Sequence, residues 1–229
     1  MSIAEKLTTI AENETRVYEA GKQFEYDYFW DNCQINGSRS GYQYGFAGWG
    51  WRDETFKPKY DIVPTGNASY MFYLCYITDL EKALNNKKLS FAKLKTAAYV
   101  FATCPYLTVV PEIDITTAEY SNLSYWFDNS TALTTIRKIK VKEATTYVGA
   151  FNNCKSLQNI TFEGVIGTNI SFQHSPLTVE SMNSIISCLK DYSVEGGTHT
   201  LTLKADRETM LSDEEKAVAT NKGWTLVWS

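Results

Sequence analysis

The chain has 229 residues, of which 44% are hydrophobic and 21% are charged, an ordinary composition for a folded protein that excludes a disordered chain. Its 22 basic and 26 acidic residues leave a formal net charge of −4, which gives no general attraction to phosphate backbones, so we expect no nucleic-acid partner. No apolar run approaches the ~20 residues needed to span a bilayer and no basic leader opens the chain, so we expect neither membrane insertion nor an ordinary secretion signal.

Residues 1–35 are predicted to form one long helix. Ser2 and Glu5 match a capping box, which satisfies backbone donors in the first helical turn. Apolar residues then recur at alternating three- and four-residue steps, the heptad pattern of a coiled coil. The seam consists of Ile3, Leu7, Ile10, Val17, Phe24 and Tyr28. The pattern predicts a homo-oligomer, with a trimer favoured, and leaves docking on the chain's own body or on another protein as the alternative.

Residues 36–66 are predicted to form an aromatic N-terminal cap. Asn36-Gly37 ends the helix, because this pair readily adopts the left-handed backbone conformation. The aromatic segment that follows can cover the first copy of a stacked repeat, whose core would otherwise face water. A second interpretation treats Tyr42, Trp49 and Trp51 as a platform that stacks on sugar rings.

Residues 67–177 contain a recurring phrase: a phenylalanine, a Cys or Ser three positions later, and in most copies a leucine six positions later. The phenylalanines are Phe72, Phe101, Phe127, Phe151 and Phe172, which lie 29, 26, 24 and 21 residues apart. Units of this size cannot bury their own apolar face and must stack on their neighbours. The spacing therefore predicts a solenoid. The cysteines at the repeated position are expected to pack as small, reduced hydrophobic residues.

The repeat spacing also predicts how residues outside the phenylalanine position are arranged. Tyr70, Tyr99 and Tyr125 each stand two positions before a motif phenylalanine, so they should lie above one another at about the 5 Å spacing of neighbouring strands. They are either packed aromatic rings or an exposed ladder for a glycan or peptide. Residues 138–142 alternate lysine with apolar residues, which predicts a solvated strand face or, as the alternative, a site for an anionic polymer.

The repeated phrase resembles the BspA-like family of bacterial leucine-rich repeats, over about residues 68 to 177, with a departure at Thr78 where the family has leucine. The resemblance implies a curved β-solenoid used for binding. The opening helix is also similar to that of structural proteins from phages and prophages of gut bacteria. Residues 215–226 resemble the ending of many BspA-like and gut-phage surface proteins.

Residues 178–229 are predicted to form a mixed α/β cap. Val179, Met182 and Ile186 fit one helix face, and Ser212 with Glu215 forms another capping box. The predicted fold class is therefore α+β: a leucine-rich-repeat-like β-solenoid with an N-terminal coiled-coil helix and a mixed C-terminal cap.

These patterns predict a non-enzymatic phage or prophage virion protein, of fibre or decoration type, assembled in the bacterial cytoplasm. Residues 1–35 would bind copies of the chain or another virion protein, and the repeats would bind a host-surface glycan or protein. No metal or cofactor is expected, because the chain has no Cys-x-x-Cys pair and only two histidines. The alternatives are a BspA-like adhesion module on the bacterial surface and a glycoside-active enzyme using carboxylates such as Glu112, Asp114 and Glu119.

Overall fold

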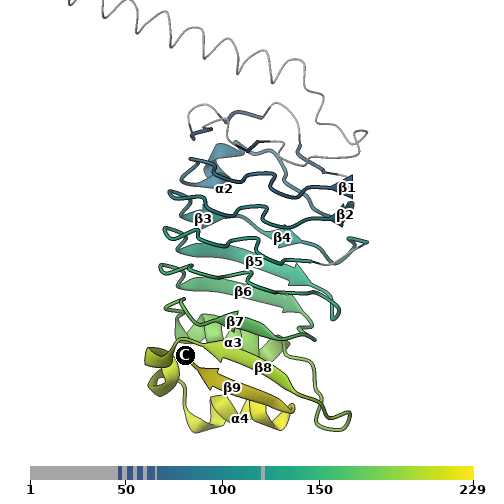
Figure 1. Ribbon diagram of the computed structural model, residues 1–229, viewed down its shortest axis with the longest axis vertical. Coiled ribbons are helices and arrows are strands. Elements are labelled where there is room, and N and C mark those ends of the chain that lie inside the picture. Colours follow the sequence, from purple (N-terminus) through teal and green to yellow (C-terminus); the bar gives the residue numbers. More distant parts are fainter. Residues whose placement is uncertain (1–45, 48–50, 54–55, 59–60, 65, 120–121) are drawn as a thin grey trace, which may run out of the picture.

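The computed structural model describes residues 46–47, 51–53, 56–58, 61–64, 66–119 and 122–229. Figure 1 shows their chain segments lying one above another along the long axis, with the C-terminal sheet and helices at one end. The predicted heptad helix of residues 1–35 and its seam lie outside the described residues. In chain order the described elements are β1 (Gly66–Asn67), α2 (Leu80–Ala83), β2 (Leu94–Thr96), β3 (Val109–Val110), β4 (Ile113–Asp114), β5 (Thr135–Val141), β6 (Asn159–Gly164), β7 (Ile170–Phe172), α3 (Val179–Cys188), β8 (His199–Leu203), η1 (Ala205–Met210), α4 (Asp213–Asn221) and β9 (Trp224–Trp228).

The strand pairs of these elements are all parallel. One sheet pairs β1 with β2, and another has the order β7-β8-β9. In the four-stranded sheet, β3 and β4 pair with one edge of β5 while β6 pairs with the other. Parallel pairing follows because each copy of the repeat crosses the molecule in the same direction and returns through a connection.

The predicted fold class, an α+β leucine-rich-repeat-like β-solenoid, is wrong. The described chain is a mixed α/β structure with three separate small parallel sheets and few helices. Two local features interrupt the regular repeat. Pro111, which has no N–H to donate, follows β3 and separates it from β4. After the copy that contains Phe72, the chain forms the short helix α2, whose N-cap Asp79 accepts a hydrogen bond from the Lys82 N–H.

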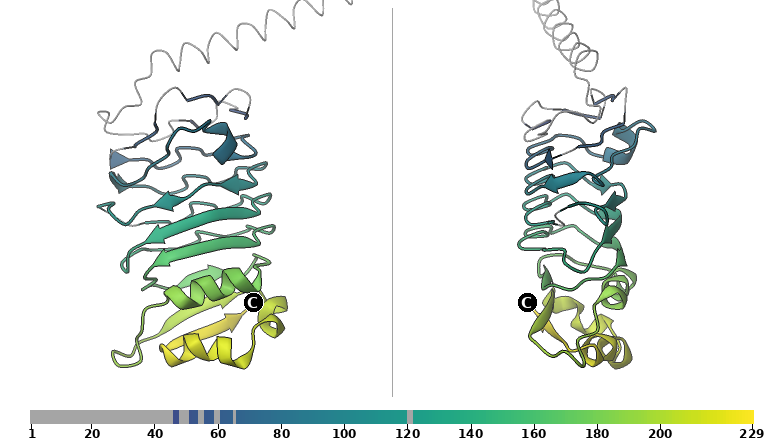
Figure 2. Two further views of the ribbon diagram at one scale, coloured as in Figure 1. Left: turned by 180° about the vertical axis from the view of Figure 1, so that it is seen from behind. Right: turned by 90° about the vertical axis from the view of Figure 1, so that its right-hand side faces the viewer.

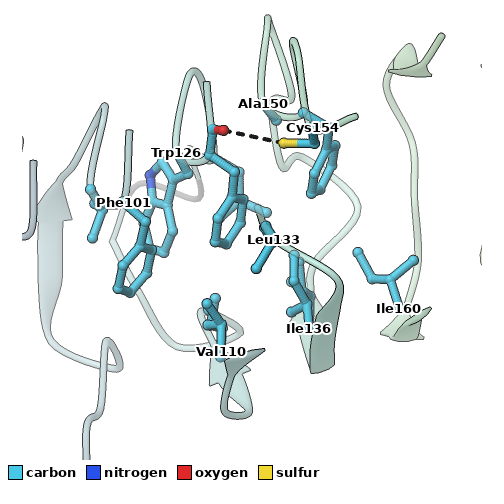
Figure 3. Packing of buried hydrophobic residues seen from close by; sticks show 14 of the residues in the cluster. Phe101, Val110, Trp126, Leu133, Ile136, Ala150, Cys154 and Ile160 are labelled. Carbon is cyan, nitrogen blue, oxygen red and sulfur yellow. Dashed lines mark hydrogen bonds between the residues drawn. The ribbon is translucent and has the colours of Figure 1, made fainter. Parts of the chain in front are cut away.

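The motif phenylalanines nevertheless form a continuous file in the core. Neighbouring ring centroids lie 5.2 Å apart for Phe72 and Phe101, 5.4 Å for Phe101 and Phe127, 5.7 Å for Phe127 and Phe151, and 4.4 Å for Phe151 and Phe172. All five side chains are buried. A fully buried phenylalanine contributes about 3–5 kcal/mol relative to alanine. Figure 3 shows part of this file packed against aliphatic residues of the sheet side.

The backbone around the first four motif phenylalanines alternates its conformation. The residues two positions before and two positions after each of these four have positive φ, for example 57° at Tyr99 and 56° at Thr103. This alternation lets the N–H of a motif phenylalanine reach the following copy of the repeat. There it donates to the carbonyl of the residue just before that copy's phenylalanine. The bonds run from Phe72 to Val100 (2.8 Å), from Phe101 to Trp126 (2.7 Å) and from Phe127 to Ala150 (3.0 Å).

The Cys or Ser three positions after each phenylalanine is buried, as expected, but it also donates a hydrogen bond to the preceding copy. Cys104 Sγ donates to the Phe72 carbonyl at 3.0 Å, Ser130 Oγ to the Phe101 carbonyl at 2.7 Å, and Cys154 Sγ to the Phe127 carbonyl at 3.2 Å (Figure 3). Thiol and hydroxyl groups are both donors, and this explains why the two residue types alternate in one column. Burial raises the pKa of the Cys75 thiol to about 12 and that of Cys104 further. These thiols are therefore protonated and poorly reactive near neutral pH.

An aromatic cluster closes the N-terminal end of the file. The Phe46 and Phe56 rings lie 5.0 and 5.7 Å from the Phe72 ring, and Trp51 lies 5.8 Å from Phe56. All of these side chains are buried. These described residues belong to the segment predicted as a cap. The platform interpretation is corrected at Trp51, because a buried indole has no face to offer a sugar. Tyr42 and Trp49 lie outside the described residues.

The C-terminal end is a small α/β layer. Helices α3 and α4 cover one face of the β7-β8-β9 sheet (Figure 2). The capping box at the start of α4 is present: Ser212 Oγ accepts from the Glu215 N–H, and the Glu215 carboxylate accepts from the Ser212 N–H at 2.8 Å. Trp224 is buried and its indole N–H donates to the Lys190 carbonyl at 2.8 Å.

The donor role of the Cys and Ser column can be tested at Cys154. Alanine at this position removes the Sγ donor to the Phe127 carbonyl, which keeps only its bond from the Ser130 N–H. We expect Cys154→Ala to lower the free energy of unfolding by about 0.5–1.5 kcal/mol. Cys154→Ser is the matched control, since Ser130 occupies the same column and donates to the equivalent Phe101 carbonyl, and it should lose less unfolding free energy. Equal losses in urea denaturation would show that the column acts by packing alone.

Candidate ligand-binding face

Tyr70, Tyr99 and Tyr125 form a stacked row on the outer side of the repeats. Their ring centroids lie 4.8 Å apart at both steps, with interplanar angles of 2° and 4°. Each side chain is half-buried. We call these three residues the tyrosine row. Because the rings cover one another's faces, the row offers solvent mainly ring edges and phenol hydroxyls.

The row ends at Gly149 for a steric reason. Gly149 occupies the same repeat position with φ +61°, and a Cβ built there would lie 2.4 Å from Cε1 of Tyr125. The Tyr125 ring thus fills the space that a fourth side chain would need. Asn152 Nδ2 also lies 3.0 Å from that Cβ position, which places this amide beside the end of the row.

Polar side chains continue the face beyond the tyrosine row. Asn153 Nδ2 donates to Asn129 Oδ1 at 2.9 Å, and Asn129 Nδ2 donates to Asp128 Oδ2 at 3.1 Å. These three residues and Asn152 lie one or two positions after Phe127 and Phe151. We call them the polar row.

Electrostatics connect the two rows. Burial raises the pKa of Tyr99, and electrostatic repulsion of its phenolate by the neighbouring phenol groups and by the Asp128 carboxylate raises it further. Burial also raises the pKa of the Asp128 carboxyl, although the hydrogen bond from Asn129 acts in the opposite direction. The Asp128 N–H also donates to the Tyr125 carbonyl at 3.3 Å, so the two rows are neighbours on the same copy of the repeat.

Two of the three lysines of residues 138–142 are paired with acidic residues of neighbouring copies. Lys138 Nζ lies 2.9 Å from Glu163, and Lys140 Nζ lies 2.7 Å from Glu112, whose hydrogen bond raises the pKa of Lys140. Lys142 donates to a backbone carbonyl at 2.6 Å. Such partly exposed pairs add little stability, but they cancel the positive charge that an anionic polymer would need.

The carboxylates considered for glycoside cleavage are also engaged. Besides Glu112, Glu119 lies 4.0 Å from Lys95. Burial raises the pKa of Asp114, but the hydrogen bonds from Thr116 outweigh this and lower it overall. A general acid for glycosidic cleavage needs a raised pKa. The lowered pKa of Asp114 is the opposite of what this role requires.

A hollow of about 510 Å³ lies beside α2, on a different part of the molecule from the tyrosine row. Its lining includes Glu81, Glu112, Lys87 and Lys88, so charges of both signs share one space. In the described part of the chain, no three His, Cys, Asp or Glu side chains gather as a metal-binding group would require. Nothing in the hollow assigns it a ligand.

Of the site residues predicted from sequence, the structure brings together Tyr70, Tyr99 and Tyr125, and it places Trp51 in the core. The polar row was not predicted. The only signal for it was the pair of polar residues after the phenylalanine in the third and fourth copies, and these look like ordinary turn residues. Their proximity to the tyrosines is visible only in three dimensions.

Comparison with protein-family models, with curated proteins and with solved structures finds no match to this chain. The resemblances to BspA-like repeats and to phage structural proteins therefore remain predictions. Within the described ranges, no helix is both long and apolar enough to cross a membrane. The face formed by the tyrosine and polar rows is the strongest candidate for a functional site.

The close fit at Gly149 predicts a measurable difference between two glycines. Gly149→Ala forces both a left-handed alanine and a displaced Tyr125 ring, whereas Gly196→Ala carries only the backbone strain, since nothing lies within 4 Å of its Cβ position. We expect Gly149→Ala to be the more destabilising by about 1–3 kcal/mol. Urea denaturation of both variants measures this difference. Equal losses would mean that the Tyr125 ring gives way freely.

The raised pKa of Tyr99 predicts a loss of stability in alkali. A tyrosine whose pKa is higher in the folded state contributes stability that is complete below its unfolded pKa, about 10, and declines as the pH rises above it. We expect Tyr99→Phe to show a shallower alkaline decline in unfolding free energy than the unchanged protein. Tyr106→Phe, which alters an exposed tyrosine outside the row, is the control. Identical alkaline profiles for the unchanged protein and Tyr99→Phe would contradict the coupling.

Proposed function

We propose that this chain is a non-enzymatic virion protein of a phage or prophage, of fibre or decoration type, whose tyrosine and polar rows contact a ligand on the host surface. The observation that carries the binding part of the proposal is the tyrosine row. Its rings repeat at 4.8 Å with nearly parallel planes and stand on the outer side of the repeats. Tyrosine combines apolar area with a hydroxyl, and it is enriched at binding surfaces for this reason.

The rigidity of the face supports a binding role. Backbone hydrogen bonds join the copies on which the row stands, with the Tyr70 N–H donating to the Ala98 carbonyl and the Tyr125 N–H to the Val148 carbonyl, both at 2.9 Å. The stacked rings also restrict one another. A surface that is ordered before binding loses little conformational entropy when its ligand arrives.

The virion part of the proposal is supported by the sequence resemblances at both ends of the chain. It has a direct test: antibodies against the full chain should label phage particles released from a strain that carries its gene. Labelling confined to the bacterial surface, with particles unlabelled, would overturn the virion assignment and favour an adhesion module.

The binding part predicts a specific loss of cell attachment. A triple variant, Tyr70→Phe, Tyr99→Phe and Tyr125→Phe, keeps the stacked rings and removes only the hydroxyls. We expect fluorescently labelled protein to bind host cells roughly tenfold or more weakly, because three hydrogen bonds are lost. Unchanged circular dichroism would establish that the fold is intact. Tyr106→Phe is the control, since Tyr106 is 54% exposed and lies outside the row.

Flow cytometry gives the attachment directly. If the triple variant bound as strongly as the unchanged protein and the control, the tyrosine row would not be the contact surface. If the unchanged chain failed to bind cells of any candidate host, the proposal of host attachment would be lost altogether.

A further inference from the structure

The tyrosine row presents hydroxyls at a constant interval. Both steps between neighbouring rings measure 4.8 Å, and the planes are parallel within 4°. Stacked rings do not offer their faces to a sugar ring, so contact falls on the hydroxyls and edges, which repeat along the long axis. A regular row of this kind fits a polymer whose own hydroxyls repeat at a similar interval and which lies parallel to the axis.

The polar row stands beside this track, because Asn129 and Asn153 lie four positions after Tyr125 and Gly149 in the same copies, and it continues to His174 near the C-terminal sheet. Its carboxamides are already aligned, because the Asn153 side chain donates to the Asn129 side chain of the preceding copy. The backbone N–H of Asn153 donates to His174 Nδ1 of the following copy at 3.3 Å. His174 lines a hollow of about 430 Å³ with Lys204 and Asp206, whose charges form an ion pair. The outer face thus carries hydrogen-bonding groups on the copies from Tyr70 to His174. Neither the tyrosine row nor the polar row contains a basic side chain.

Charge narrows the class of ligand. Among the residues of the tyrosine and polar rows, Asp128 alone is charged, and it is acidic. An anionic polymer would meet this carboxylate without a compensating cation. Phenol hydroxyls and carboxamides donate and accept hydrogen bonds equally well, which matches neutral sugar hydroxyls.

The backbone argues against an extended peptide. Peptides that add to a protein as a strand need unpaired backbone groups. Here the Tyr99 N–H donates to the Ser124 carbonyl at 3.3 Å, and the Thr103 N–H to the Asp128 carbonyl at 2.7 Å. These outward-facing segments are already paired with the next copy.

We infer that the face binds a linear, uncharged polysaccharide that lies along the long axis, with the tyrosine row and the neighbouring polar row contacting its sugar units. This inference rests on the proposed function and adds to it the class and direction of the ligand. The polymer spans several copies of the repeat, so its affinity grows with its length until both rows are covered.

The test is calorimetric titration of the full chain with neutral linear oligosaccharides, from disaccharide to octasaccharide, of the gluco, manno and xylo series. We expect affinity for at least one series to rise with length. A double variant, Asn129→Gly and Asn153→Gly, removes two carboxamides while keeping the left-handed backbone, since φ is 59° and 54° at these positions. It should bind the longest oligosaccharide roughly two- to tenfold more weakly for each carboxamide lost and leave the shortest unchanged.

The matched control is Asn85→Gly with Asn86→Gly. These asparagines also have positive φ, 46° and 65°, and lie in the segment after α2, outside both rows. The control should bind all lengths as the unchanged protein does. Equal weakening by the control variant would show that the loss is general and would overturn the assignment of the polar row.

Cell binding separates this inference from the proposed function. If binding to host cells depended on the tyrosine hydroxyls but was abolished by protease treatment of the cells and unaffected by oligosaccharides, the ligand would be a protein. That result would overturn the polysaccharide inference and leave host attachment standing. Binding to acidic polysaccharides alone, or affinity independent of length, would also overturn it.

Discussion

In the first three copies, the N–H of the motif phenylalanine donates to the carbonyl of the residue just before the next motif phenylalanine, and this bond fixes the register between copies. It appears at Phe72, Phe101 and Phe127 with lengths of 2.7 to 3.0 Å. Once this bond forms, equivalent positions of successive copies must lie above one another. The phenylalanine rings then stack in the core, each thiol or hydroxyl meets a carbonyl of the preceding copy, and the tyrosine rings stack on the outer side. A slip of one residue would exchange inward and outward side chains and expose the core.

The sequence allowed part of this fold to be predicted. Regular spacing indicated that Phe72 to Phe172 share one core, because short units must bury their apolar faces against one another. The capping box of Ser212 and Glu215 was also visible, since its spacing is local. The fold class was wrong because strand pairing depends on contacts between copies of unequal length. Pro111 and the helix α2 then divided what periodicity suggested would be continuous.

The candidate face could likewise be predicted from the sequence only in part. The tyrosine row could be predicted because one residue type recurs at one position. Trp51 could not be assigned from its neighbours in sequence, since it is buried by Phe46 and Phe56 only after the chain folds. The polar row was hidden because asparagine commonly adopts positive φ, so Asn129 and Asn153 have a sufficient local reason to be present.

The ladder of backbone bonds has chemically different ends. At its start the Met71 carbonyl accepts from the Phe46 N–H at 2.8 Å, and at its finish the Asn153 N–H meets the imidazole of His174 instead of another carbonyl. Each terminus is thus occupied by a group from the same molecule. A head-to-tail contact between identical copies would require free donors at one extremity and free acceptors at the other, and such contacts build open filaments. Along this ladder the Met71 carbonyl and the Asn153 N–H are both paired within the chain, so neither group is left to bond to another copy.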